Sequence, residues 1–182
     1  MNTLRELFVD QIKDIYSAEQ QLIKALPKMV KRASCKSLKQ GFTDHLSETE
    51  EQAKRLESLA SSLNFNVPGK KCKAMEGLIA EGKDALEITG DDAVIDAAII
   101  AAAQRVEHYE ISAYGTALAI AERLRLSEAV NTLQQSLNEE KATDRKLTEI
   151  CLSEVFEAMP DEDEYGDIYD EIEDEDLELT IP

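Results

Sequence analysis

Acidic side chains occupy one face of a predicted helix where apolar side chains are expected. Between residues 92 and 125, positions that recur at steps of three and four residues are otherwise mostly isoleucine, alanine or tyrosine, the pattern of a buried helical face. Glu107 and Glu110 fall on two of these steps, so their carboxylates should point into the protein. Because an unpaired buried carboxylate is strongly destabilising, such groups are normally protonated, paired with a cation or bound to a metal ion.

Two earlier helical patterns are interrupted in the same way. Glu19 replaces an apolar residue near the middle of the helix predicted over residues 3–33. In the helix predicted over residues 38–63, His45 lies on the inward face, and Glu48 follows at a spacing that places both on one side. Taken alone, Glu19 could be a shoulder residue that reaches solvent, and His45 could be a partly exposed histidine at an interface.

A fourth long helix, predicted over residues 127–156, also carries acids on its apolar face. Glu140 and Asp144 both fall among its inward positions. Glu139 lies about 100° from that line on a helix of 3.6 residues per turn, so it is expected to be solvated. Each of the four long helices is thus predicted to bring at least one acid to the interior.

Two-metal sites inside helical bundles are built from carboxylates of several helices together with imidazole groups. The acids predicted on all four helices, together with His45, therefore indicate such a site. Oxygen ligands favour manganese or iron over zinc or copper, although they do not separate those two metals. The competing interpretation is a set of buried acids that are protonated or paired with lysine. No feature of the sequence decides between a metal-dependent enzyme and a non-enzymatic protein.

The heights of these acids along their helices indicate which of them can meet. Measured from the turn that joins their helices, Glu110 and Glu140 lie at nearly equal distances, given a rise of about 1.5 Å per residue. By the same measure Glu19 and Glu48 differ by about 5 Å. The second pair is therefore expected to meet, whereas the first pair fits less well.

Three further polar residues accompany the acids of residues 92–125. His108 is displaced from the line of Glu107 and Glu110, so it is expected to support a ligand from outside or to lie at the surface. Tyr109 and Tyr114 are candidate redox or hydrogen-bonding neighbours of a metal. Each could equally pack in the core with its hydroxyl bonded to a carboxylate.

The order of the helical patterns predicts an all-α protein with one domain over residues 1–157. A shorter helix over residues 75–88 is expected to belong to a long crossover that lets the third long helix start at the same end as the first. Residues 158–182 form an acidic tail with too little apolar content to pack, so disorder is its expected state. An alternative is a partner-binding segment, because four apolar residues recur there at helical spacing, namely Tyr165, Ile168, Tyr169 and Ile172.

Charge and composition narrow the possible functions. The formal charge of −18 is concentrated at one end, since residues 161–182 hold 12 acids and no base, which leaves −6 for the other 160 residues. This charge disfavours binding to nucleic acid or to an anionic membrane surface. No run of eighteen apolar residues is present, and the three cysteines show no paired spacing, so a soluble protein of the reducing cytoplasm is expected.

Four segments read YSAEQQL, HLSET, VEHYEISAYG and NEEKATD, beginning at residues 16, 45, 106 and 138, and KAMEGL lies in the predicted crossover. Together these segments resemble the YciF/YciE-like branch of the ferritin-like superfamily. The resemblance covers about residues 3–155. It implies a ferritin-like four-helix bundle in up-down-(crossover)-down-up order, with a short extra helix in the crossover. It also implies a bacterial stress-associated homodimer with two iron or manganese ions per chain.

Carried over residue by residue, the ligands of such a centre fall on Glu19, His45, Glu48, Glu107, Glu110 and Glu140. Neighbours of the ligands, or alternative ligands, would be Asp144, His108, Glu139, Tyr109 and Tyr114. The usual Glu-x-x-His order is reversed at His45 and Glu48, and Thr143 stands where a histidine would follow Glu140. The implied function is a carboxylate-bridged di-metal protein of the stress response, with peroxide or dioxygen as candidate substrates. The alternative is a non-enzymatic structural or metal-binding dimer.

Overall fold

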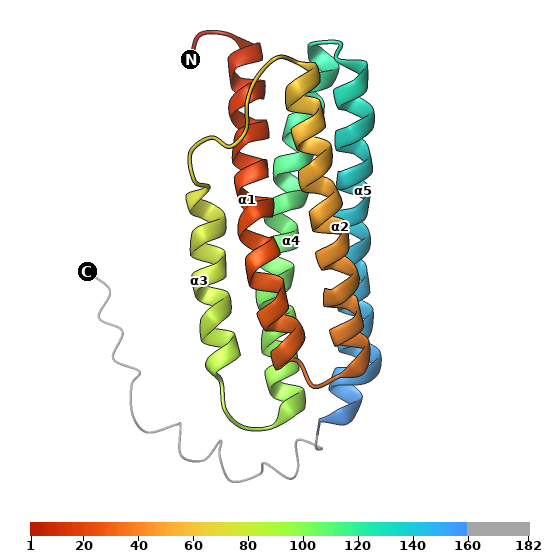
Figure 1. Cartoon of the computed structure of the whole chain (residues 1–182). Helices are drawn as coiled ribbons and strands as arrows, with labels where there is room; N and C mark the ends of the chain where they lie inside the picture. The colour runs from red at the N-terminus through yellow and green to blue at the C-terminus, as the bar shows by residue number, and fades with distance from the viewer. Residues whose placement is uncertain (160–182) are drawn as a thin grey trace, which may run out of the picture.

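A computed structural model describes residues 1–159 of the 182-residue chain. Its helices are α1 (Leu4–Arg32), α2 (Lys36–Ser62), α3 (Lys73–Glu87), α4 (Asp92–Arg123) and α5 (Ser127–Ile150), followed by a π-helical turn (Cys151–Val155) and a 3₁₀ turn (Phe156–Ala158) (Figure 1). No strand occurs in this part of the chain. The all-α prediction is confirmed, and α1 to α4 begin and end within two residues of their predicted bounds. The acidic segment beyond residue 159, including the apolar positions from Tyr165 to Ile172, lies outside the described residues.

Local sequence fixes where several helices begin. Thr3 caps α1, because its hydroxyl accepts the backbone N–H of Glu6 while the Glu6 carboxylate accepts the N–H of Thr3. The Asp91 carboxylate caps α4 by accepting the backbone N–H groups of Ala93 and Val94. These caps satisfy backbone donors that a helix leaves unpaired at its first turn.

The four long helices form an antiparallel bundle in which α1 packs against α2, α4 against α5, α2 against α5 and α1 against α4. α4 begins where α1 ends, since the Asp96 carboxylate of α4 accepts the backbone N–H groups of Ser34 (2.8 Å) and Cys35 (2.6 Å) just after α1. The expectation that the third long helix starts at the same end as the first is therefore wrong. The up-down-(crossover)-down-up order is the observed one (Figure 1).

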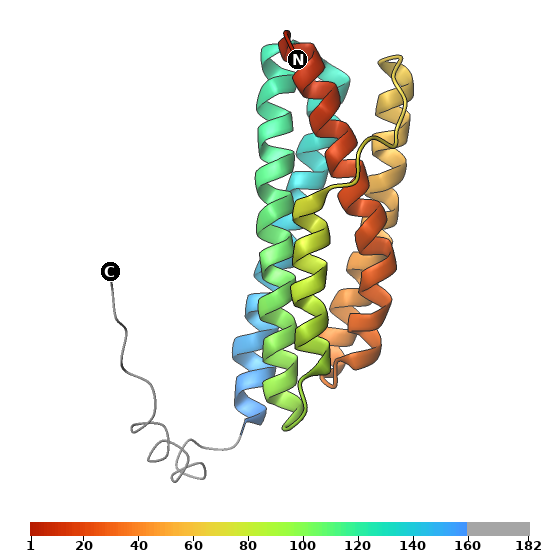
Figure 2. The ribbon, with the colours of Figure 1, turned by 90° about the vertical axis from the view of Figure 1, so that its left-hand side faces the viewer.

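The crossover explains this direction. The connection after Ser62 and α3 together run along the length of the bundle, with α3 lying against α1 and α4 (Figure 2). A crossover of that length carries the chain from the end where α2 finishes to the opposite end. α4 consequently runs parallel to α2 and antiparallel to α1.

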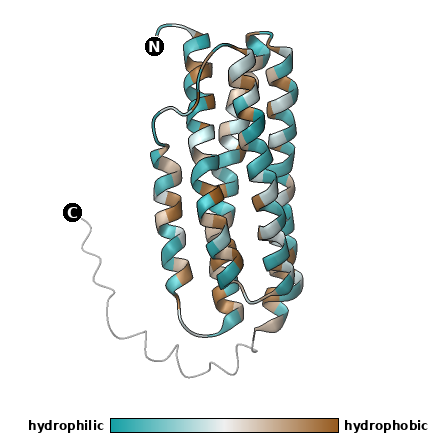
Figure 3. Ribbon diagram, viewed as in Figure 1, coloured by the Kyte–Doolittle hydropathy of each residue, from teal (hydrophilic) through white to brown (hydrophobic). Residues whose placement is uncertain are grey.

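Hydrophobic and hydrophilic residues alternate along each helix, as expected for amphipathic helices that share one core (Figure 3). The core is divided into two clusters. One lies towards the α1–α2 turn and includes Leu22, Phe42, Ile100, Ala103 and Leu147. The other lies towards the opposite end and includes Ile12, Ile15, Leu56, Ala117 and Leu133. Among the described helices, none combines the length and apolarity needed to cross a bilayer.

Candidate metal centre

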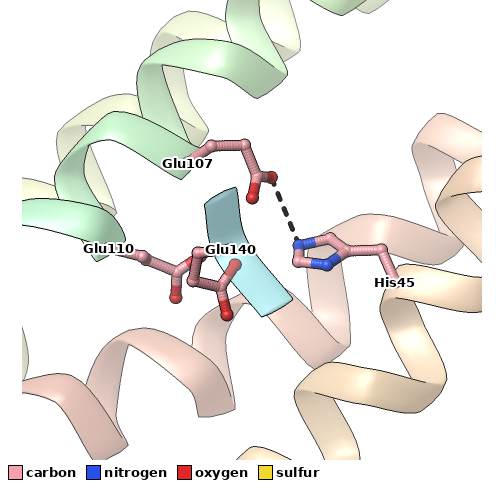
Figure 4. Close-up of side chains that lie close together, drawn as sticks. All are labelled: His45, Glu107, Glu110 and Glu140. Atoms are coloured by element: carbon pink, nitrogen blue, oxygen red, sulfur yellow. Dashed lines mark ion pairs between the residues drawn. The ribbon is translucent and has the colours of Figure 1, made fainter. Parts of the chain in front are cut away.

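A layer of buried polar side chains lies between the two hydrophobic clusters. His45 of α2, Glu107 and Glu110 of α4, and Glu140 of α5 point toward one another (Figure 4). One possible ligand atom from each residue lies within 4.8 Å of those of the other three. Glu19 of α1 is also fully buried, and its charge contributes to raising the pKa of Glu110. Five of the residues predicted to be ligands are thus brought to one level of the bundle.

Many polar atoms of this layer lack a hydrogen-bond partner. Of the eight such buried side-chain atoms in the described part of the chain, six belong to the five predicted residues, namely Glu19 Oε2, His45 Nε2, Glu107 Oε2, Glu110 Oε1, Glu110 Oε2 and Glu140 Oε2. His45 Nε2 lies 3.2 Å from Glu107 Oε1, but the contact does not have hydrogen-bond geometry. Since folded proteins pair more than about 90% of their buried polar atoms, this group needs a further partner.

Burial and mutual repulsion raise the pKa of three of these carboxyl groups, Glu19, Glu110 and Glu140, and so favour their protonated forms. Burial raises the pKa of Glu19 to about 7, against the opposing effect of the Tyr114 hydroxyl. Burial, together with the charges of Glu19 and Glu140, raises the pKa of Glu110 well above its usual range. The pKa of Glu140 is raised well above its usual range mainly by burial. A cation bound among these groups would relieve the same repulsion and displace those protons.

The single imidazole of the layer behaves differently. Burial of His45 opposes its positive charge, but the nearby Glu107 carboxylate overcomes this effect and raises the pKa of His45 well above its usual value. Without a metal, the layer therefore favours the imidazolium form of His45. A metal ligand must instead be the neutral imidazole, so metal binding would release this proton.

Neutral donors hold two of the carboxylates in place. The Tyr114 hydroxyl donates to Glu19 Oε1 at 2.5 Å, and the Gln52 amide donates to Glu140. Tyr114 is therefore a buried residue whose hydroxyl is bonded to a carboxylate, which is one of the two roles considered for it from the sequence. Gln52 was not predicted as a site residue, although it is a polar residue on the apolar face of α2 and could have been found by the criterion that identified the acids.

Glu48 does not reach this layer. Its side chain is 45% exposed, and its Oε2 atom lies 3.9 Å from His45 Nδ1. The inward face of α2 is centred on His45, Thr49 and Gln52, all buried, so Glu48 falls on the side of the helix that faces α5. The roughly 5 Å offset between Glu19 and Glu48 expected from helix geometry agrees with this placement.

Asp144 and Glu139 of α5 also lie outside the layer. Asp144 is half-buried at the α4–α5 interface, where it accepts hydrogen bonds from Gln104 and lies 3.3 Å from the exposed imidazole of His108. The prediction that Asp144 points inward is therefore wrong. Glu139, expected to be solvated, forms a half-buried ion pair with Arg55. On a helix of 3.6 residues per turn, Glu139 is offset by about 100° from Glu140 and Asp144 by about 40°. The packing of α4 and α2 against α5 decides where each one points.

Tyr109 faces away from the candidate centre. Its hydroxyl donates to Asp14 at 2.5 Å and lies 2.9 Å from the Cys72 sulfur, between α1 and the start of α3. Tyr109 therefore holds the crossover against α1 and, among the described residues, has no hydrogen bond to the acidic layer. Of the two tyrosines considered from the sequence, Tyr114 is the one whose hydroxyl is hydrogen-bonded to a predicted ligand.

The family described as "Domain of unknown function (DUF892)" matches residues 3–159. The chain belongs to this family. Protein YciF of Escherichia coli (strain K12) is 45% identical over 156 residues, which cover 85% of this chain and 94% of YciF. The resemblance to YciF-like proteins inferred from the four sequence segments is thereby confirmed.

Solved structures share the fold. The crystal structure of the E. coli stress protein YciF has a TM-score of 0.83 and 43% sequence identity, covering 87% of this chain and all (100%) of YciF. YcfI from Rhodopseudomonas palustris, described as a candidate structural protein, has a TM-score of 0.78 and 47% identity, covering 81% of this chain and 94% of YcfI. A protein from Xanthomonas campestris, with a TM-score of 0.68 at 19% identity, covering 85% of this chain and 94% of its own, has the same fold.

Proposed function

We propose that this protein is a ferritin-like di-metal protein of the bacterial stress response, with iron or manganese held in the buried acidic layer. The observation that carries the proposal is the set of six unpartnered polar atoms from five residues on four helices. Its similarity to YciF, described as a stress protein, supports the cellular role. A homodimer in the cytoplasm is the assembly and location that we propose with it.

The donor set fits such a centre. Glu19, His45, Glu107, Glu110 and Glu140 offer oxygen atoms and one imidazole nitrogen, which suit iron or manganese. Four ionised carboxylates with a neutral imidazole carry a formal charge of about −4, which two divalent cations would neutralise. A single divalent cation would leave two negative charges buried. Charge balance therefore supports two ions per chain.

The protein's own groups would control the environment of the ions. When bound, two redox-active ions supply electron exchange with peroxide or dioxygen. Tyr114 orients Glu19, and Gln52 orients Glu140, by donating hydrogen bonds to them. The hydrophobic clusters on both sides exclude water, which strengthens the electrostatic interactions of the layer.

A non-enzymatic structural or metal-binding dimer is the second candidate. The raised pKa values of Glu19, Glu110 and Glu140 favour it, because protonated carboxyl groups can remain buried without a metal. Its similarity to YcfI, described as a candidate structural protein, points in the same direction. Peroxide consumption distinguishes the enzyme from both non-enzymatic forms.

The test begins with metal analysis of the purified protein. After removal of metal by a chelator, addition of Mn²⁺, or of Fe²⁺ without oxygen, should raise the melting temperature. At a free metal concentration one hundred times Kd, mass action contributes about 2.7 kcal/mol, which corresponds to roughly 5–10 °C for a chain of this size. An unchanged melting temperature with either metal would contradict the di-metal proposal. Peroxide consumption is then compared between metal-loaded and metal-free protein.

A further inference from the structure

Glu48 lies outside the acidic layer but next to one of its members. A cavity of about 230 Å³ lies between α2 and α5, and its polar lining consists of Asp44, His45, Glu48, Thr143 and Lys146. Glu48 is 45% exposed, whereas His45 is almost completely buried. The cavity therefore connects an exposed carboxylate with a residue of the candidate centre.

The two nitrogen atoms of His45 face different surroundings. Nδ1 lies 3.9 Å from Glu48 Oε2 and 3.4 Å from Thr143 Oγ1, and both of those residues line the cavity. Nε2 lies 3.2 Å from Glu107 Oε1 in the buried layer. The imidazole ring thus forms the wall between the cavity and the acidic layer, with one possible ligand atom on each side.

The charges around the cavity favour a cation. Its lining holds two carboxylates, Asp44 and Glu48, against one ammonium group, Lys146. Lys146 is held by Asp44 at 2.9 Å, which leaves Glu48 as the cavity carboxylate that lies beside His45 Nδ1. The lining repels anions and attracts divalent cations, because like charges in a cleft focus the potential.

A larger cavity elsewhere provides a contrast. The cavity of about 600 Å³ between α1, α4 and the start of α3 contains four lysines against two aspartates. No residue of the acidic layer lines it. That cavity is both positively charged and separate from the candidate centre, so it is unsuited to delivering a cation there.

We infer that the cavity between α2 and α5 is the route by which a divalent cation reaches the acidic layer, with Glu48 capturing the ion and His45 passing it inward. The inference rests on the proposed function. The ion first meets the Glu48 carboxylate and His45 Nδ1, and rotation of the imidazole then delivers it to Glu107. In this role Glu48 governs the rate of metal uptake, not the amount bound at equilibrium.

The test follows uptake of Mn²⁺ by metal-free protein, using the electron paramagnetic resonance signal of free Mn²⁺. Glu48→Gln should slow uptake about tenfold at low salt, within the range known for charged clefts. The final Mn²⁺ content per chain should equal that of the wild type. Glu50→Gln is the matched control, because Glu50 is exposed on the same helix and does not line the cavity. Its uptake rate should be that of the wild type.

A second variant has an effect of opposite sign. Lys146→Gln removes the positive charge at the cavity and should accelerate uptake about threefold at low salt. That gain should vanish at 1 M salt, where the Debye length is about 3 Å. The slower uptake of Glu48→Gln should persist there, since that variant lacks the capturing ligand itself.

Three other results would contradict the inferred route. Equal uptake rates for the wild type and Glu48→Gln, with full Mn²⁺ content in both, would overturn the route and leave the proposed function intact. A lower equilibrium Mn²⁺ content in Glu48→Gln would make Glu48 a ligand and would also overturn the inference. Wild-type protein that takes up no Mn²⁺ and no Fe²⁺ would overturn the proposed function and the route together.

Discussion

Replacement of Glu110 by leucine separates metal ligation from structural burial. Glu110 is 1% exposed, and neither of its carboxylate oxygens has a hydrogen-bond partner. The charges of Glu19, Glu140 and Glu107 all oppose its ionisation, and the described structure places no lysine or arginine against it. In the metal-free protein, Glu110→Leu should therefore stabilise the bundle by about 1–3 kcal/mol, because leucine removes a buried carboxyl group that has no partner and is repelled by its neighbours.

The assay compares melting temperatures in the presence of a chelator. For a chain of this size a change of 1–3 kcal/mol corresponds to a rise of about 2–12 °C. Glu110→Gln should gain less, because its amide leaves polar atoms buried without partners. Glu122→Leu, an exposed site on the same helix, should change stability by less than about 0.5 kcal/mol and controls for added apolar surface.

Metal content completes the comparison. Both Glu110 variants should bind less manganese or iron than the wild type, since an amide is a poor ligand and leucine is none. A metal-free Glu110→Leu protein that melts below the wild type, together with unchanged metal content, would refute the reasoning. Glu110 would then be a structural acid that stabilises the fold through a base, and the non-enzymatic dimer would become the preferred function.

Three further outcomes are expected. The folded state raises the pKa of Glu19 from 4.5 to about 7 and that of His45 well above 6.5, so it holds protons that the unfolded chain releases. The stability of the metal-free protein should therefore fall as pH rises from about 4.5 to 8. A melting temperature that stays constant or rises over this range would contradict this prediction. Tyr114→Phe removes the hydroxyl that donates to Glu19 and should cost about 1–3 kcal/mol in urea denaturation, while an unchanged midpoint would show that this bond contributes nothing. Deletion of residues 161–182 removes 12 acids and should leave helical circular dichroism and metal content unchanged, whereas loss of the helical signal would make that segment structural.

Helical periodicity alone was enough to predict the buried acids. Glu19, Glu107, Glu110 and Glu140 each replace a core residue at the centre of an apolar face, and such positions point inward whatever the neighbouring helix. The bounds of α1 to α4 followed from the same periodicity. The sequence was sufficient for these acids because the pattern within a single helix determines whether such a side chain points inward.

Residues at the edge of an apolar face could not be placed in this way. Glu48 and Asp144 each lie one turn from a buried ligand candidate. The direction of Glu48 depends on how α2 packs against α5, and that of Asp144 on how α4 packs against α5. Gln52 was not predicted as a site residue because a neutral amide on an apolar helix face indicates a metal site less strongly than a carboxylate does. The direction of α4 depended on whether the crossover runs along the whole bundle. That path is decided by how α3 packs against α1 and α4, and no local sequence pattern specifies it.

The attachment of α3 has a consequence for how the protein opens. Met75 is the only buried residue of that helix, and Gly77 and Gly82 lower its intrinsic helical stability by about 1 kcal/mol each. Its backbone amides should therefore exchange with solvent through local unfolding, while those at the centres of the four long helices exchange only when the whole bundle unfolds. Since α3 contributes no residue to the acidic layer, the crossover can open and close while the four helices keep their carboxylates in place.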